Sequence, residues 1–298
     1  SITVQAQSSD GSIQSQTFNI TINDLDEFDV SVPTDSDAAT NEVDENVVVG
    51  TTVGITADAF DLDATNNAIS YSLTSNPDGL FQIDAVTGEV TTAAAIDREA
   101  HGATRSITVQ AQSSDGSIQT QTFNVAINDL DEFDVTVPTD TDAATNEVDE
   151  NVVVGTTVGI TADAFDLDAT NNTISYSLTS NPDGLFQIDS GTGAVTTAAA
   201  IDREAHGATR SITVQAQSSD GSIQTQVFNI TINDLDEFDV SVPTDSDGAS
   251  NEVDENVVVG TTVGVTADAF DLDATNNTIT YSLTSNPDGL FQIHANSG

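Results

Sequence analysis

The 298-residue chain contains no cysteine and no lysine, and its basic side chains are four arginines and three histidines. Without cysteine there are no disulfides and no thiolate ligands for soft metals. Without lysine there is no Schiff-base chemistry and no P-loop of the kind that holds a nucleotide phosphate. Redox, soft-metal and phosphate chemistry by these routes are therefore excluded.

Aromatic side chains are also scarce, with no tryptophan and three tyrosines. Two carboxylates can form the acid and base of a glycosidase, but such pairs come from separate elements around a cleft that carries sugar-stacking aromatics. Arg203 is interpreted as a counter-charge to its acidic neighbours, and His206 as an exposed turn residue. No nucleophile, base and pocket combine into a catalytic set, so we expect no enzyme.

Basic charge is almost absent, because 49 acidic residues face four arginines and the formal net charge is −45. Such a surface repels nucleic acid, whose binding needs lysine and arginine, and it repels anionic membranes for the same reason. No apolar run is long enough to span a bilayer. We expect no nucleic acid partner and no membrane contact by this segment. Many acids gather in short motifs, which favours cation binding over a solvating coat.

The chain repeats itself with a period of 105 residues, because SITVQAQSSDGSIQ begins at Ser1, Ser106 and Ser211. Residues 1–105 and 106–210 differ at only nine positions. Arrays of this kind contact mainly their own neighbours and gain reach with each added copy. Neighbouring repeats are therefore expected partners within the chain.

The period divides the chain into two complete and two incomplete repeats. Residues 1–28 resemble the last strands of a repeat, 29–133 and 134–238 are complete, and 239–298 resemble the first part of another. We expect a piece of a longer array whose signal and anchor lie elsewhere. The incomplete repeat after Phe238 is expected either to be disordered or to borrow strands like those at 1–24 from another chain.

Apolar residues alternate with polar ones along each repeat, as in half-buried β-strands. Turn-forming clusters stand between these segments, for example SSDGS at 113–117 and TSNPDG at 179–184. No segment has a long helical pattern or demands a helix, and the alanines at 198–200 are interpreted as part of a strand or loop. The pattern predicts an all-β fold of tandem antiparallel β-sandwiches arranged in a linear rod. In the period that covers residues 106–210, the alternating apolar residues are Ile107, Val109, Ala111, Phe123, Val125, Ile127, Val158, Ile160, Ile174, Tyr176, Leu178, Phe186 and Ile188.

Four acidic clusters recur in each repeat. In a strand-like segment, residues i and i+2 face the same side, so Asp166 with Asp168 and Asp202 with Glu204 are each expected to present two carboxylates to one point. Ca²⁺ takes six to eight oxygen ligands and needs neither nitrogen nor sulfur. These clusters therefore match the ligands that Ca²⁺ requires.

These motifs resemble the cadherin repeat in both sequence and order. Five elements carry the resemblance: Glu150-Asn151 (EN), Asp166-Leu167-Asp168 (DxD), Phe186 to Asp189 followed by Gly193 (FxID…TG), Asp202-Arg203-Glu204 (DRE) and the linker Asp129 to Phe133 (DxNDN). The resemblance implies Greek-key sandwiches of the cadherin and immunoglobulin type. It also implies two to three Ca²⁺ at each junction, held by EN and DRE of one repeat, by the linker, and by DxD of the next.

The implied ligands follow residue by residue. For the junction near 133 they are Glu45, Asp97, Glu99, Asp129, Asp131, Glu132, Asp166 and Asp168. For the junction near 238 they are Glu150, Asp202, Glu204, Asp234, Asp236, Glu237, Asp271 and Asp273. The junction near 28 has half of its ligands, which are Asp24, Asp26, Glu27, Asp61 and Asp63.

The linker departs from the family pattern, because Asp131, Glu132 and Phe133 stand where the family has Asn, Asp and Asn. At the spacing of the family's A-x-D ligand the chain has Ser113, and the nearest acid is Asp115. Whether Asp115, its counterpart Asp220 or Asn171 binds metal is left open, as is the third Ca²⁺.

The resemblance predicts calcium-rigidified extender repeats of a secreted or cell-surface adhesin, similar to large bacterial arrays of the RTX type. Near-identical copies, acidity and the lack of cysteine and lysine favour a bacterial origin. An alternative is a carbohydrate-binding module in which Ca²⁺ is purely structural. The adhesive target, whether surface carbohydrate or another cell-surface molecule, is left open.

Overall fold

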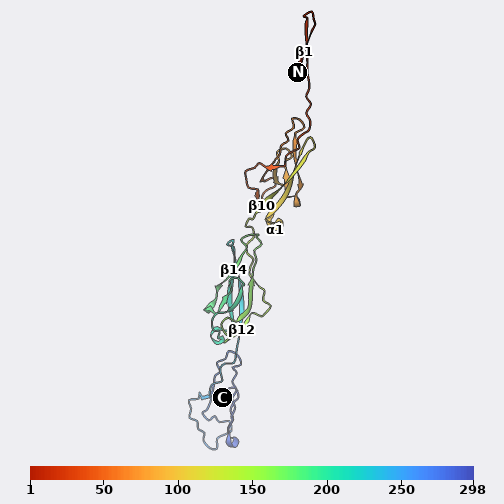
Figure 1. Ribbon diagram of the computed structural model, residues 1–298. Coiled ribbons are helices and arrows are strands. Elements are labelled where there is room, and N and C mark those ends of the chain that lie inside the picture. Colours follow the sequence, from red (N-terminus) through yellow and green to blue (C-terminus); the bar gives the residue numbers. More distant parts are fainter. The chain divides into compact units, whose positions relative to one another are not determined.

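The computed structural model describes all residues, 1–298, and divides into two compact units (Figure 1). Unit 1 contains residues 1–132 with 168–170, and unit 2 contains residues 133–167 with 171–298. The regular secondary structure of both is almost wholly β-strand, as the sequence predicts. No helix is long and apolar enough to cross a membrane.

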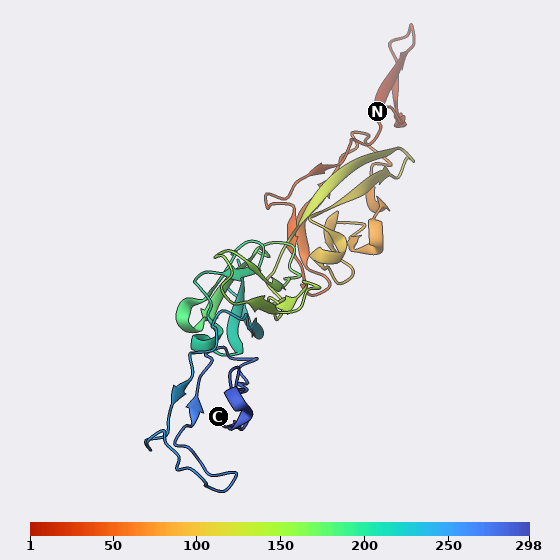
Figure 2. The same cartoon turned by 90° about the horizontal axis from the view of Figure 1, so that it is seen from below.

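Unit 1 contains two four-stranded sheets, with the orders β4-β10-β9-β6 and β3-β5-β8-β7, and a separate two-stranded sheet β1-β2. The strands are β1 (Ile2–Gln7), β2 (Ile13–Phe18), β3 (Thr34–Asp35), β4 (Glu42–Asp44), β5 (Thr52–Asp58), β6 (Ile69–Ser75), β7 (Phe81–Ile83), β8 (Glu89–Thr92), β9 (Thr104–Ser113) and β10 (Ile118–Asn128). The long hairpin β9–β10 forms the centre of the first sheet, and it is yellow to yellow-green in Figure 2.

Unit 2 repeats this pattern with the sheets β12-β18-β17-β14 and β11-β13-β16-β15, followed by the small sheet β19-β20. Its strands are β11 (Thr139–Asp140), β12 (Glu147–Asp149), β13 (Thr157–Asp163), β14 (Ile174–Ser180), β15 (Phe186–Ile188), β16 (Ala194–Thr197), β17 (Thr209–Ser218), β18 (Ile223–Asn233), β19 (Thr244–Asp245) and β20 (Ala267–Asp268). Each alternating segment predicted between residues 107 and 188 lies in one of these strands or in β9 and β10.

Strand pairing is antiparallel with one exception in each unit. β4 runs parallel to β10, and β12 runs parallel to β18, with Val148 opposite Ile232. The sheets are therefore antiparallel as predicted, apart from this short edge strand. The parallel pairing places the residue after the strand, Glu45 or Glu150, beside the chain that leaves β10 or β18.

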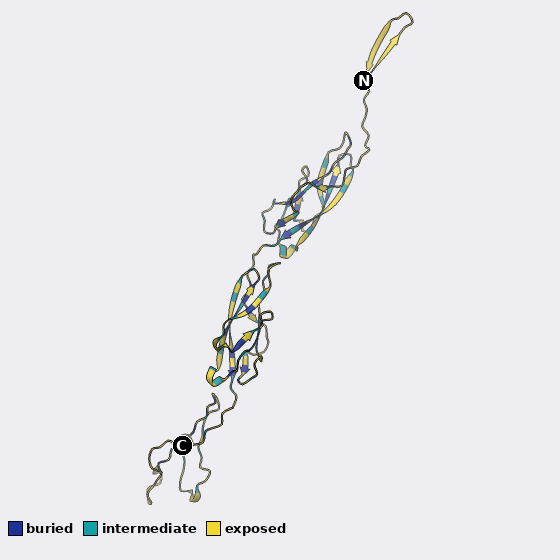
Figure 3. Cartoon of the chain, turned by 60° about the vertical axis from the view of Figure 1, so that its left-hand side comes forward, coloured by how far each residue is buried: buried dark blue, intermediate teal, exposed yellow.

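The core of each repeat lies between its two sheets, where the inward residues of alternating strands meet (Figure 3). In unit 2 this core includes Val158, Phe186, Ile212 and Ile230, all of which are buried. β-Branched and aromatic side chains pack well on a pleated, half-buried surface, which explains why these segments form strands. The outward residues are mainly Ser, Thr, Asn and Gln, as the sequence predicts.

Two short helices, α1 (Arg98–His101) and α2 (Arg203–His206), lie where the sequence shows no helical pattern. Asp202 is the N-cap of α2, and its carboxylate accepts a hydrogen bond from the backbone N–H of Ala205 at 2.7 Å. Gly207 ends the helix by donating its N–H to the carbonyl of Arg203. Aspartate caps and glycine C-caps stabilise a single turn that is too short for a periodic apolar pattern. The 3₁₀ turns η1 (Pro77–Gly79), η2 (Pro182–Gly184) and η3 (Pro287–Gly289) are similarly local.

Candidate metal centres

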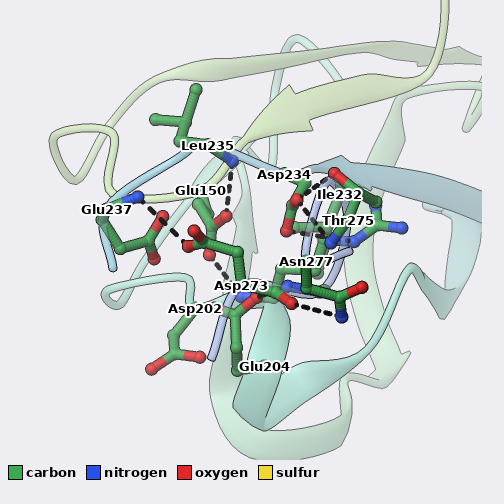
Figure 4. Close-up of polar contacts among 12 residues, drawn as sticks. Glu150, Asp202, Glu204, Ile232, Asp234, Leu235, Glu237, Asp273, Thr275 and Asn277 are labelled. Atoms are coloured by element: carbon green, nitrogen blue, oxygen red, sulfur yellow. Dashed lines mark hydrogen bonds and ion pairs between the residues drawn. The ribbon is translucent and has the colours of Figure 1, made fainter. Parts of the chain in front are cut away.

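Three glutamates meet in unit 2 near the end of β18 (Figure 4). One carboxylate oxygen each of Glu150, Glu204 and Glu237 lies within 4.8 Å of the other two. Glu150 follows β12, Glu204 lies on α2, and Glu237 lies in the linker after β18. Three segments that are distant in the sequence therefore contribute oxygens to one point, which is the arrangement that a hard cation needs.

Glu150 is completely buried and holds two of these segments together. Its Oε1 accepts a hydrogen bond from the backbone N–H of Leu235 at 2.7 Å, and its Oε2 accepts one from the backbone N–H of Arg203 at 2.6 Å. A buried carboxylate is stable only when it is hydrogen-bonded or paired. Glu150 therefore fixes the start of the linker against the DRE helix.

Asp234 joins the linker to the loop that follows the DxD motif. Its Oδ2 accepts hydrogen bonds from the backbone N–H of Thr275, at 2.9 Å, and from the Thr275 hydroxyl. The hydroxyl bond, against some desolvation, lowers the pKa of Asp234 below its ordinary value. The buried Oδ1 has no hydrogen-bond partner and lies 3.7 Å from Nε of Arg203. This oxygen is available to a cation.

Asp273 is buried and binds the backbone of the linker. Its Oδ1 accepts hydrogen bonds from the backbone N–H groups of Glu237, at 3.2 Å, and Phe238, at 3.1 Å. Asp271 accepts a hydrogen bond from the backbone N–H of Asp273 at 3.2 Å, which forms an Asx turn. The DxD segment is thus a turn and not a strand, so the prediction that its two carboxylates share a strand face is wrong.

The DRE segment also differs from the predicted strand geometry. Asp97 and Asp202 use one carboxylate oxygen as helix caps, and neither belongs to a group of three acidic residues, whereas Glu99 and Glu204 do. In a helical turn residues i and i+2 point in different directions, because they are 200° apart at 3.6 residues per turn. The first acid of DRE is therefore separated from the second.

The glutamates of unit 2 are electrostatically unfavourable in the absence of a cation. Desolvation and repulsion from Glu150 raise the pKa of Glu204 and of Glu237 above their ordinary values. A shared hydrogen bond and repulsion from Asp273 raise the pKa of Asp236. A divalent cation would offset this repulsion, because an opposite charge favours the ionised form.

Unit 1 contains the same glutamate cluster, formed by Glu45, Glu99 and Glu132. Glu45 is completely buried and accepts hydrogen bonds from the backbone N–H groups of Leu130, at 2.8 Å, and Arg98, at 2.5 Å. Desolvation and repulsion from Glu45 raise the pKa of Glu132. The two clusters are therefore built by the same contacts, one repeat apart.

The neighbouring contacts of unit 1 also match those of unit 2. Glu99 accepts a hydrogen bond from the backbone N–H of Ala169 at 2.8 Å, and Asp129 accepts one from that of Thr170 at 2.8 Å. Asp168 is buried and accepts one from the N–H of Glu132 at 3.2 Å. Of the other predicted ligands, Asp131 is exposed in unit 1 and Asp166 is buried in unit 2.

Unit 1 contains a second kind of cluster, made of aspartates. One oxygen each of Asp26, Asp63 and Asp115 lies within 4.8 Å of the other two. Asp63 is buried and accepts a hydrogen bond from the N–H of Glu27 at 3.2 Å. Close by, Asp61 accepts a hydrogen bond from the Ser113 hydroxyl at 2.5 Å.

Asp115 is the residue that the sequence analysis left open. Its Oδ1 accepts a hydrogen bond from the backbone N–H of Ser117 at 2.6 Å, while its buried Oδ2 has no hydrogen-bond partner. The turn between β9 and β10 bends the chain so that Asp115, and not Ser113, provides a carboxylate to the aspartate cluster. The sequence signal for this ligand is the turn-forming SSDGS segment at 113–117. Residue spacing alone does not show which residue of that turn faces the cluster.

Asp24 is another ligand predicted for the junction near 28. Its Oδ2 accepts hydrogen bonds from the backbone N–H, at 2.9 Å, and the hydroxyl, at 2.8 Å, of Thr65. The same bond joins Asp129 to Thr170 and Asp234 to Thr275. Sequence reasoning missed these threonines because they follow the DxD motif and carry no charge.

Comparison with known proteins identifies one matching family model and many relatives. The Cadherin domain model matches residues 39–128 and 145–233. Human protocadherin Fat 4 is 34% identical over 251 residues, covering 82% of this chain and 5% of the relative. Human protocadherin-1 is 31% identical over 249 residues, covering 80% of this chain and 23% of the relative. The chain thus spans a small part of the length of these relatives.

Solved cadherin structures share the fold. A crystal structure of mouse cadherin-23 EC22-24 matches with a TM-score of 0.66 and 26% identity, covering 90% of this chain and 86% of that chain. The extracellular cadherin domains 1–5 of protocadherin gamma B2 match with a TM-score of 0.70 and 18% identity, covering 100% of this chain and 64% of that chain. The second likeness shows the fold alone.

Proposed function

Because the chain belongs to the cadherin family, we propose that its repeats are calcium-binding extender modules of a cell-surface adhesion protein. Cadherin repeats are modules of adhesion proteins and not of enzymes. The observation that supports calcium binding is the glutamate cluster, in which three segments place carboxylate oxygens within 4.8 Å of one another. Every potential ligand in it is an oxygen, as Ca²⁺ prefers.

We infer that the ligands of the junction near 238 come from the EN, DRE, linker and DxD motifs. The proposed set is Glu150, Glu204, Asp234, Asp236, Glu237, Asp271 and Asp273, with Asp202 contributing its free oxygen or capping α2 alone. The corresponding residues serve the junction near 133, and Asp24, Asp26, Glu27, Asp61, Asp63 and Asp115 serve the junction near 28. We propose two to three Ca²⁺ per complete junction.

Calcium-dependent stiffening follows from the charges. In the absence of a cation, the carboxylates repel one another, as the raised pKa values of Glu204 and Glu237 indicate. Binding Ca²⁺ only in the folded, closed junction stabilises that form by RT ln(1 + [Ca²⁺]/Kd). Extracellular calcium modules bind at about 10⁻⁴ to 10⁻³ M, so the junctions would fill after secretion.

We further propose that the array is extracellular and belongs to a large bacterial surface adhesin of the RTX type. Near-identical repeats, the net charge of −45 and the lack of lysine and cysteine support this origin. The two relatives described above are human proteins and the cadherin-23 structure is a mouse protein, so the comparisons support the cadherin repeat and not the bacterial context. The proposed repeat boundaries lie after residues 28, 133 and 238. Nothing in the site or the relatives supports the carbohydrate-binding alternative.

The experiment that tests calcium binding is thermal unfolding of the 298-residue chain in excess EDTA, in millimolar Ca²⁺ and in millimolar Mg²⁺, all at high NaCl. Salt at about 1 M screens general repulsion between exposed charges to a Debye length of about 3 Å. A large rise in Tm with Ca²⁺ alone is expected. An equal rise with Mg²⁺ would show that the acids are a solvating coat and would overturn the proposal.

A further inference from the structure

Two of the four arginines occupy equivalent positions, each beside the first acid of a linker. In unit 2, Nε of Arg203 lies 3.7 Å from Oδ1 of Asp234. In unit 1, Nε of Arg98 lies 3.8 Å from Oδ1 of Asp129. At most 20% of any of these four side chains is exposed. Each group of candidate calcium ligands therefore already contains one mostly buried positive charge.

Backbone contacts fix the position of each guanidinium group. Nη1 of Arg203 donates a hydrogen bond to the carbonyl of Ile232 on β18, and the backbone N–H of Arg203 donates one to Glu150. Nη1 of Arg98 donates to the carbonyl of Ile127 on β10 in the same way. These carbonyls come two residues before the linker aspartates. The end of the strand therefore holds the guanidinium group beside the start of the linker.

The ion pair in unit 2 is not a hydrogen bond, because 3.7 Å is too long for one. The buried Nε of Arg203 and the buried Oδ1 of Asp234 each lack a hydrogen-bond partner, although buried polar atoms usually have at least one. The other oxygen of Asp234, Oδ2, is bound by the N–H and the hydroxyl of Thr275. Oδ1 is therefore the Asp234 oxygen that is open both to the guanidinium group and to a metal ion.

We propose that Arg203 and Arg98 are internal counter-cations, which hold the linker aspartates in the metal-free chain and lower the affinity of these sites for Ca²⁺. The inference rests on the proposed function, because it concerns the calcium sites proposed above. It assigns a role to the middle residue of DRE, whose side chain has no oxygen to offer a metal. The carboxylates bind the metal, and the arginine sets the calcium concentration at which they do so.

Repulsion between the arginine and the metal is the reason for the lowered affinity. An arginine side chain is always charged, so it cannot lose a proton when a metal binds nearby. A metal ion on Oδ1 of Asp234 would share that oxygen with a guanidinium group whose Nε is 3.7 Å away. Like charges at such separations repel one another even in water, and salt screens them little where they are partly buried. Calcium therefore binds more weakly than it would to the carboxylates alone.

The same positive charge stabilises the metal-free chain. The Thr275 hydroxyl bond is the largest cause that lowers the pKa of Asp234, and attraction to Arg203 adds to it against desolvation. The guanidinium group thus favours the ionised, docked form of the linker aspartate when no metal is bound. Removing its charge should destabilise the metal-free chain and strengthen calcium binding. These two effects have opposite signs, which makes them separable by experiment.

Paired substitutions test the proposal in the 298-residue chain, because they change the sites of both units alike. Arg98→Gln combined with Arg203→Gln removes both internal cations. The Ca²⁺ concentration at half-saturation, measured by calorimetric titration in about 0.15 M NaCl, should fall about fivefold, the effect of unit charges about 4 Å apart in bulk water. In EDTA, the same variant should have a lower Tm than the unsubstituted chain. A residue with a purely structural role would lower Tm without strengthening calcium binding.

The matched control is Arg105→Gln combined with Arg210→Gln, which removes the same net charge at other positions. These arginines form ion pairs at 2.9 Å with Asp78 and Asp183. Neither aspartate belongs to a group of three acids that could hold a metal. Calcium affinity in this variant should therefore match that of the unsubstituted chain. The difference between the two Gln variants isolates the position of the charge from the net charge of the chain.

Arg98→Lys combined with Arg203→Lys separates charge from shape. Lysine keeps the positive charge but loses the planar, forked geometry of the guanidinium group. Calcium affinity should stay close to that of the unsubstituted chain, while Tm in EDTA falls. Arg98→Met combined with Arg203→Met removes the charge and keeps a long unbranched side chain. It should bind calcium as tightly as the Gln variant, and it takes the place of that variant if the Gln substitutions prevent folding.

The outcomes distinguish this inference from the proposed function. Failure of the unsubstituted chain to bind Ca²⁺ would overturn both. Calcium binding by the unsubstituted chain, with unchanged or weaker affinity in the neutral variants, would overturn the inference alone. Tighter binding in the Lys variant would do the same, because the charge would not be the cause. An equal gain in the Arg105→Gln, Arg210→Gln control would assign the effect to net charge and would also overturn the inference.

Discussion

The carboxylate of Glu204 accepts a hydrogen bond from the backbone N–H of Ala274 at 2.8 Å, across 70 residues of sequence. Glu204 lies on α2, and Ala274 follows the DxD motif of the next 105-residue period. The same bond joins Glu99 to Ala169 in unit 1. This side chain thus ties two periods of the repeat together before any cation is considered, and its oxygens are also part of the glutamate cluster.

Glu204→Gln is therefore expected to have opposite effects with and without Ca²⁺. The amide oxygen of glutamine still accepts the Ala274 hydrogen bond, and the substitution removes a charge whose pKa is raised by desolvation and repulsion. In EDTA, Tm should be unchanged or higher. In Ca²⁺, the gain in Tm should fall, because one anionic ligand has gone. Thermal unfolding under both conditions measures the two effects.

The matched control is Glu147→Gln, which removes the same charge from an exposed position on β12 in the same repeat. It should leave the calcium-dependent gain within the error of the unsubstituted chain. A Glu204→Gln variant that keeps its full gain in Ca²⁺ would show that Glu204 is not a ligand, whatever its effect in EDTA.

Glu150→Gln is expected to destabilise the chain both with and without Ca²⁺. Both oxygens of the buried Glu150 accept backbone N–H groups, so the glutamine NH₂ must face a donor. Losing one such bond costs about 1–3 kcal/mol because a buried group is left unsatisfied. Urea unfolding in EDTA measures this cost, and calcium titration should show weaker binding. A loss no greater than that of Glu147→Gln would contradict the structural role of Glu150.

Much of the fold is readable from the sequence, because period-two alternation is long and regular in the strands. Apolar and polar residues alternate along most of β9 and β17, from Ile107 to Gln112 and from Ile212 to Gln217, and the apolar side chains are buried as alternation predicts. The 3.6-residue period of a helix is invisible in α1 and α2, which last for one turn. Their stability comes from the caps Asp97 and Asp202, whose sequence pattern also fits a strand or loop.

The sequence identifies the acidic motifs, but it does not predict how the carboxylates within each motif are arranged. Spacing alone predicts a strand for the DxD motif, whereas in its first copy Asp61 accepts a hydrogen bond from the N–H of Asp63 at 3.0 Å. Asp115 joins a cluster because the β9–β10 turn redirects the chain, which a count of residues cannot show. The assignment of these residues as calcium ligands, and the repeat boundaries, stay predictions.

The pH dependence of stability is expected to reverse with calcium. Desolvation and carboxylate repulsion raise the pKa of Glu132, Glu204 and Glu237 above their ordinary value of 4.5. Raised pKa values add stability that is complete below pH 4.5 and is lost as the pH rises through the raised values. In EDTA, Tm should therefore increase as the pH falls from about 7 to about 5.

Further acidification should lower Tm again in EDTA. Desolvation acts to raise the pKa of Asp129, but the hydrogen bonds from Thr170 help to lower it below 3.8. The hydrogen bonds from Thr275 likewise lower the pKa of Asp234 below 3.8, against desolvation. Stability from these groups is present above that value and is lost as the pH falls through the lowered pKa. With saturating Ca²⁺, Tm should instead fall between about pH 7 and 5, because protons compete for the ligands. Parallel curves with and without Ca²⁺ would contradict metal binding by these glutamates.

Gly193→Ala should destabilise the second repeat far more than Gly184→Ala. Both glycines have positive φ, 72° and 67°, so each alanine pays a similar backbone cost of about 1–2 kcal/mol. A Cβ at Gly193 would lie 2.0 Å from the carbonyl oxygen of Ala162, whereas a Cβ at Gly184 would meet nothing within 4 Å. The difference between the two variants isolates this collision from the strain.

Urea unfolding measures that difference, and the first complete repeat provides an internal reference because its glycines are unchanged. A collision with backbone forces strands β13 and β16 apart, since Gly193 precedes β16 and Ala162 lies on β13. We expect an additional loss of about 2 kcal/mol or more in Gly193→Ala, visible as an earlier transition of one repeat. Equal losses in the two variants would mean that the turn before β16 relaxes without moving β13, and that the close approach of these strands is not required for the sandwich.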